Sequence, residues 1–133
     1  MEYRLIRTIL NRLPIPFAGL RIDEIVRVPT PPTHPVGTQY LGVIWHRARR
    51  HFMLHGLVGE RYFVLDSTQL QATNSCGVYT LLFAFLICFD IFNAEKLFVG
   101  MSRKSATTPE LRVINDNLMI EVLQDFLRNE LLA

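Results

Sequence analysis

The apolar run from Val78 to Phe89 constrains the fold more than any other stretch of this chain. It stops at Asp90, which makes it too short to span a bilayer, since a membrane-spanning helix needs about 20 apolar residues. A helix that is apolar on all sides has to be buried inside the protein. The run therefore predicts a core helix packed against a sheet.

A cysteine stands at the start of this predicted helix. Cys76 follows the polar segment 73–75, which is typical of a loop that caps a helix. A helix N-terminus stabilises a thiolate, so a cysteine there can act as a nucleophile, and Gln71 is placed to offer an amide to an oxyanion. Cysteines are also often small buried hydrophobic residues, which is how we interpret Cys88. The order of polar loop, glutamine, Cys-Gly and apolar helix favours a cysteine-peptidase site.

Composition is that of one compact domain over residues 1–133, with 50% hydrophobic and 20% charged residues. A chain of this length can bury a core without metal or disulfide support. With only two cysteines and no zinc-type spacing, we expect no disulfide framework, no metal and no other cofactor. The first residues lack the plan of a signal peptide. These features favour a reducing, intracellular compartment, such as the host nucleus or cytoplasm or a virion if the chain is viral.

Hydrophobic periodicity and the positions of Pro and Gly predict the elements. In chain order these are a helix over 2–13, a strand over 21–28, a loop over 29–37, strands over 39–45, 51–55 and 61–66 with turns at 47–50 and 56–60, the helix over 76–89, a loop over 100–108 and a helix from Pro109. The last helix has a predicted apolar stripe of Leu111, Ile114, Leu118, Val122 and Phe126. The fold class is α+β, an antiparallel meander packed against the central helix, with helices at both ends of the chain.

One basic cluster stands out, formed by Arg47, Arg49 and Arg50 with His46 and His51 on either side. Arginines in such a cluster can contact nucleic-acid phosphates. A solvated hairpin tip is the commoner explanation for such a turn. We keep weak nucleic-acid contact as an alternative beside a protein or peptide substrate, and we expect no membrane partner.

The order of these features resembles the adenovirus endopeptidases, the adenain family, and more distantly the SUMO-deconjugating proteases of the same clan. The segment 66–77, Asp-Ser-Thr-Gln-Leu-Gln-Ala-Thr-Asn-Ser-Cys-Gly, is similar to the family's nucleophile loop. Weaker similarities lie at 16–23, at 40–54 and in the last helix. The resemblance implies a reduced papain-like fold and a cysteine nucleophile at Cys76, with Gln71 and the Cys76 backbone amide binding the oxyanion.

Two alignments to this clan assign the base and the acid differently. In the first, the position of the family's catalytic histidine is occupied by Gln39 and the position of its acid by His55, so the site is inactive or rearranged. In the second, His51 opens the active-site strand and Asp66 supplies the acid. His51 is the first candidate for the base and His55 the second. If the strands containing His51 and Asp66 pair as a hairpin, the two residues are directly opposite and share a sheet face. Both alignments stay open at this point.

The resemblance implies a cysteine endopeptidase that cleaves viral precursor proteins or ubiquitin-like conjugates. Gln39 and the reduced length support an alternative of another class, a degenerate peptidase fold that serves as a virion-associated or other protein-binding module. A plain α+β scaffold without a site is the third possibility.

Overall fold

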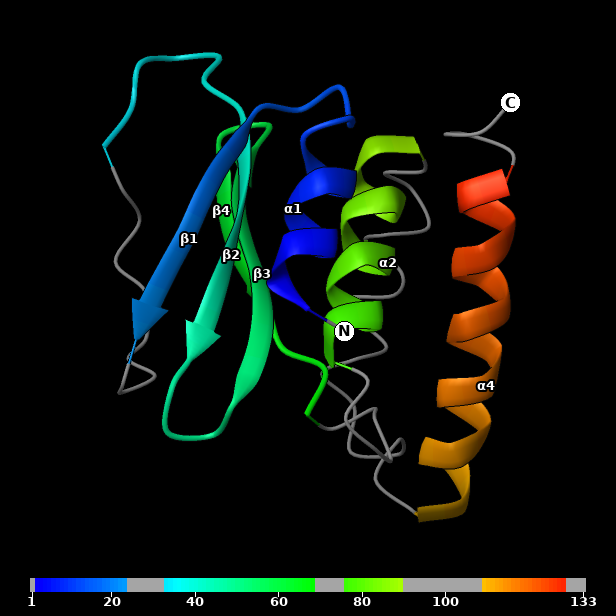
Figure 1. Cartoon of the computed structure of the whole chain (residues 1–133). Coiled ribbons are helices and arrows are strands. Elements are labelled where there is room, and N and C mark those ends of the chain that lie inside the picture. Colours follow the sequence, from blue (N-terminus) through cyan, green and yellow to red (C-terminus); the bar gives the residue numbers. More distant parts are fainter. Residues whose placement is uncertain (1, 24–32, 69–75, 90–108, 129–133) are drawn as a thin grey trace.

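A four-stranded sheet and three helices make up the described part of the chain, which covers residues 2–23, 33–68, 76–89 and 109–128 of this computed structural model (Figure 1). The elements are α1 (Tyr3–Leu10), β1 (Phe17–Asp23), β2 (Tyr40–His46), β3 (His51–Val58), β4 (Arg61–Leu65), α2 (Cys76–Phe89) and α4 (Pro109–Phe126). The α+β prediction is confirmed. The predicted loop over 100–108 and residues 24–28 of the predicted first strand lie outside the described residues.

The strands are arranged in the order β1-β2-β3-β4. β2, β3 and β4 form the predicted antiparallel meander, but β1 pairs with β2 in parallel, so the sheet is mixed and the expectation of a purely antiparallel sheet is wrong. Alternating side chains look the same in parallel and antiparallel strands, so the sequence pattern carried no information on the direction of β1. The strand also begins earlier than predicted, at Phe17. An irregularity between Phe17 and Leu20, with Gly19 at φ 93°, interrupts the alternation there.

The β3–β4 connection is shorter than the predicted turn over 56–60. β3 continues through Gly56 to Val58, and only Gly59 and Glu60 form the turn. Both have positive φ, 59° and 64°, as the two central residues of a type I′ hairpin turn require. Gly56 lies within the strand, paired with Leu41 on one side and Phe63 on the other, and a Cβ there would lie 2.6 Å from the carbonyl oxygen of Tyr40. This glycine therefore allows close strand pairing and does not mark a turn.

The helices form two layers on one face of the sheet (Figure 1). α1 and α2 lie next to the sheet, α2 packs against β3, and α4 packs against α2 on the side away from the strands. α2 has buried residues on all sides, and it spans the predicted residues from Cys76 to Phe89. The prediction of a core helix that begins at Cys76 is confirmed. No helix in the described ranges is long and apolar enough to cross a membrane.

α4 begins at Pro109 as predicted, but its buried face differs from the predicted stripe. Ile114 has 59% of its surface exposed, whereas Leu123 and Asp116 are buried. The hydroxyl of Tyr79 in α2 donates a hydrogen bond of 3.0 Å to Oδ1 of Asp116. This polar contact turns Asp116 inward, and a stripe drawn only through apolar residues missed it. The side chains at 111, 118, 122 and 126 lie outside the description.

Candidate active site

Cys76 is the first residue of α2 and is buried between that helix and β3. Its carbonyl oxygen accepts a hydrogen bond of 2.8 Å from Thr80 Oγ1, one turn further along the helix. Because Cys76 is the first residue of the helix, its thiol lies at the end where free backbone amides and the helix dipole favour negative charge. The predicted cap at 73–75 and the predicted oxyanion residue Gln71 lie outside the described residues.

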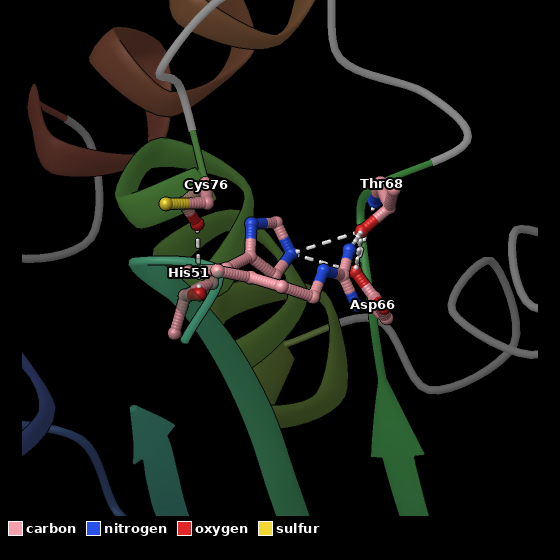
Figure 2. Close-up of polar contacts among 6 residues, drawn as sticks. His51, Asp66, Thr68 and Cys76 are labelled. Atoms are coloured by element: carbon pink, nitrogen blue, oxygen red, sulfur yellow. Dashed lines mark hydrogen bonds and ion pairs between the residues drawn. The ribbon is translucent and has the colours of Figure 1, made fainter. Parts of the chain in front are cut away.

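His51 lies at the first position of β3 and connects Cys76 with Asp66. Its Nε2 is 2.6 Å from Oδ1 of Asp66. Figure 2 shows the imidazole ring between Cys76 on one side and Asp66 and Thr68 on the other. Since Nε2 faces the carboxylate, Nδ1 is the ring nitrogen left for the thiol. The structure thus brings together three of the predicted site residues.

The pairing of β3 with β4 differs from the predicted one, although both side chains share a sheet face. Leu54 pairs with Leu65, so Asp66 is not directly across from His51 as expected. The predicted hairpin had its turn over 56–60, and the longer β3 with its two-residue turn shifts the register. His51 and Asp66 are diagonal neighbours, a separation that a long side chain can bridge.

The electrostatics of the three groups favour an ion pair between thiolate and imidazolium. Burial by itself lowers the pKa of His51, but its hydrogen bonds to Asp66 and Cys76 and the charges of both raise the pKa to about 9. For Cys76, burial raises the pKa of the thiol, and three contacts outweigh this effect. They are the hydrogen bond with His51 and backbone hydrogen bonds from Phe52 and Gly77, and the net result is a lowered pKa.

Asp66 stays charged because several donors compensate its burial. Burial raises the pKa of its carboxyl, but the hydrogen bonds from His51 and Thr68 lower it to well below the usual range. Oδ1 of Asp66 accepts a hydrogen bond of 2.9 Å from the Thr68 amide and one of 2.5 Å from Thr68 Oγ1. A charged carboxylate at this place stabilises a protonated imidazole and orients its ring.

The two residues that the first alignment places in the site lie elsewhere. Gln39 is exposed and directly precedes Tyr40, the first residue of β2. Tyr40 pairs with Leu57 near the end of β3, whereas His51 is the first residue of that strand, so Gln39 and His51 lie at opposite ends of β3. His55 is four residues after His51 on the same strand, roughly 13 Å away at the rise of a β-strand. It contacts the rings of Tyr40 and Tyr62, with centroids 5.8 and 6.1 Å apart. The partners of Cys76 are instead His51, Phe52 and Gly77.

The basic cluster forms the turn between β2 and β3, and its three arginines are exposed. Arg49 already has partners within the chain, because its Nη2 donates to Thr68 Oγ1 and its Nη1 lies 3.5 Å from Oδ2 of Asp66. Nucleic-acid contact through this turn stays a prediction.

Sequence reasoning missed Thr68, and it assigned Arg49 to a different partner. A signal for Thr68 was present, because an aspartate often accepts a hydrogen bond from the backbone amide two residues further on. No comparable local signal exists for Arg49, since 19 residues separate it from Thr68. Among the described residues, no group of three His, Cys, Asp or Glu side chains could hold a metal ion.

Comparison of the chain with protein-family models, with curated proteins and with solved structures gives no match.

Proposed function

We propose that this protein is a cysteine endopeptidase of the adenain-like type. The observation that carries the proposal is the chain of contacts from the Cys76 thiol through His51 to Asp66, with the thiol at a helix N-terminus. Enzymes that transfer acyl groups through a thiol use this arrangement, in which a base contacts the nucleophile and an acid orients the base.

In the proposed reaction, His51 holds the proton of the Cys76 thiol, and the thiolate attacks the carbonyl carbon of a peptide bond. The new C–S bond gives a tetrahedral intermediate, whose oxyanion is bound by the Cys76 backbone amide and the Gln71 side chain. As the C–N bond breaks, His51 donates its proton to the leaving amine. Water then attacks the thioester while His51 takes one of its protons. The C–S bond breaks, which releases the acid product and restores the thiolate of Cys76 beside the protonated His51. Asp66 orients the imidazole throughout and stays charged.

The arrangement of the elements supports a reduced papain-like fold. The nucleophile lies at the start of a core helix, the base is the first residue of β3, against which this helix packs, and the acid directly follows β4. The resemblance to the adenain family suggests viral precursor proteins or ubiquitin-like conjugates as substrates. It also suggests an intracellular or virion setting, which suits a free thiolate.

One observation favours a second candidate, a degenerate peptidase fold that binds a protein partner. Cys76 exposes only 8% of its surface and His51 only 5%, whereas reactive cysteines are usually partly accessible. In a protein that has lost peptidase activity, a thiol buried in this way would contribute only to the packing of the core.

Cleavage assays with matched variants separate the two candidates. The substrates are casein and a set of ubiquitin-like proteins with a fluorogenic amide at the C-terminus. We expect the parent protein to cleave at least one of them and Cys76→Ala to cleave none. His51→Ala should lower kcat/KM by about three orders of magnitude or more, because the base is lost.

Two further variants serve as controls. Cys88→Ala removes the other thiol and should leave the rate unchanged, and so should Gln39→His, which adds an imidazole far from Cys76. A parent protein that cleaves nothing but captures one of the ubiquitin-like proteins would support the binding module. Activity that survives Cys76→Ala would contradict the proposed mechanism.

A further inference from the structure

Asp66 lies just beyond the end of β4, so no ladder of backbone hydrogen bonds holds it in place. β4 ends at Leu65, and the last pair between β3 and β4 is Leu54 with Leu65. The side chain of Asp66 is also 34% exposed. A carboxylate at such a position can rotate toward solvent unless other contacts fix it. Its orientation toward His51 therefore depends on the side chains around it.

Thr68 supplies two of these contacts. Its amide and its hydroxyl both donate to Oδ1 of Asp66, the same oxygen that faces His51. A hydroxyl has one proton, so the proton given to Asp66 is not available to His51, whose Nε2 lies 3.3 Å from Thr68 Oγ1. Nε2 must then carry the hydrogen in its contact with Asp66. This leaves Nδ1 to exchange a proton with the thiol.

Arg49 contacts both Thr68 and Asp66, and on Asp66 it approaches the oxygen that does not face His51. Its guanidinium donates to Thr68 Oγ1 through Nη2 and lies 3.5 Å from Oδ2 of Asp66 through Nη1. Donation into the threonine oxygen directs the hydroxyl proton toward Asp66. The two nitrogens of one planar group thus hold two side chains at a fixed spacing, which a single ammonium cannot do as well.

We propose that Arg49 and Thr68 are positioning residues, which hold the Asp66 carboxylate on Nε2 of His51 and thereby set the ring orientation and the tautomer that the proposed peptidase reaction needs. This inference rests on the proposed function for its purpose, but not for its geometry. The role of Arg49 is geometric more than electrostatic. Its side chain is 39% exposed, and an ion pair exposed to that degree contributes little through charge alone.

The test is an NMR titration of the His51 ring nitrogens in labelled protein, for the parent and five variants. Thr68→Val keeps the shape and removes the hydroxyl, while Thr68→Ser keeps the hydroxyl. Arg49→Met removes the planar guanidinium together with its charge, and Arg49→Lys keeps the positive charge without the guanidinium. Arg50→Met is the matched control, because it removes the same charge from the neighbouring position of the same exposed turn. Thermal unfolding checks that each variant folds.

We expect Thr68→Val and Arg49→Met to lower the pKa of His51 by about one unit and to increase the Nδ1–H tautomer, because the contact with Asp66 loosens. Thr68→Ser and Arg50→Met should match the parent, and Arg49→Lys should restore only part of the shift. Unchanged titrations in both Thr68→Val and Arg49→Met would overturn the proposal. Full restoration by Arg49→Lys would also overturn it, since charge alone would then suffice. Should Thr68→Val not fold, Arg49→Met decides.

If the parent cleaves a substrate, the same two variants should lower kcat by about tenfold and leave KM unchanged, because orientation of the base matters in the chemical step. A parent without peptidase activity would refute the proposed function but not the positioning role, which the titration decides independently. Activity in the parent together with unchanged titrations would refute the positioning role alone.

Discussion

The two cysteines of this chain lie on one helix in opposite electrostatic environments. Cys76, at the first residue of α2, interacts with His51 and with two backbone amides, and the pKa of its thiol is lowered. Cys88, near the other end of α2, is half-buried against the core, and burial raises the pKa of its thiol. The residue type is the same, and only the neighbours differ.

This contrast predicts different pH dependences of alkylation. We expect the rate of Cys76 with iodoacetamide to fall less steeply than that of Cys88 as the pH is lowered from about 8, because the protonated imidazole of His51 stabilises the Cys76 thiolate. The rate of Cys88 should fall about tenfold for each pH unit below its pKa, since only the thiolate reacts. Mass spectrometry of labelled peptides gives both rates in one sample. Comparison of slopes makes the result independent of how accessible each thiol is.

Two outcomes of the alkylation experiment are informative. In His51→Ala, the profile of Cys76 should become as steep as that of Cys88. Parallel slopes for the two cysteines in the parent protein would show that Cys76 has no ion pair with His51.

At the scale of the elements, a second glycine besides Gly56 allows β2 and β3 to approach closely. Gly42 lies opposite His55, and a Cβ on Gly42 would be 2.4 Å from Nε2 of that ring. His55 is buried and has aromatic neighbours in Tyr40 and Tyr62. The glycine thus makes room for the imidazole on the sheet.

Gly42→Ala should therefore destabilise the protein by about 1–3 kcal/mol, the usual range for overpacking in a core. In the background of His55→Ala, which removes the ring, the same substitution should have a much smaller effect. Urea unfolding of the four proteins in this double-mutant cycle measures the coupling. An equal effect of Gly42→Ala in both backgrounds would mean that the glycine serves the backbone and not the histidine.

For the whole molecule, His55 links stability to pH. Burial, and then the charge of Arg21, lower the pKa of His55 to about 4, below the value of about 6.5 for an unfolded chain. The unfolded state therefore binds a proton at a higher pH than the folded state does. The free energy of unfolding should fall as the pH is lowered from about 6.5 to 4.

The variant His55→Phe keeps a ring next to Tyr40 and Tyr62 but cannot titrate. It should show a smaller loss of stability between about pH 6.5 and 4 than the parent does. Urea unfolding at closely spaced pH values tests this expectation. If the two curves have the same slope in this range, the acid sensitivity comes from other groups.

The elements could be predicted to a large extent because their signals are local. The apolar run and the polar residues before it placed α2, with Cys76 at its start, and alternating side chains placed the strands of the meander to within a few residues. Local periodicity determines which residues form a helix or a strand, and it does not depend on how the elements are packed.

What only the tertiary structure decided are the relations between distant residues. The parallel direction of β1, the register of β3 with β4 and the inward turn of Asp116 depend on packing between elements. The choice between His51 and His55 depends on the same packing, because both histidines have the same position in the alternation. Only the fold shows that His51 contacts Cys76 and Asp66, whereas His55 lies four residues further along β3 against Tyr40 and Tyr62. The sequence by itself determined that a cysteine begins a buried helix. The fold decided which imidazole meets that cysteine, and which arginine and threonine hold the acid behind it.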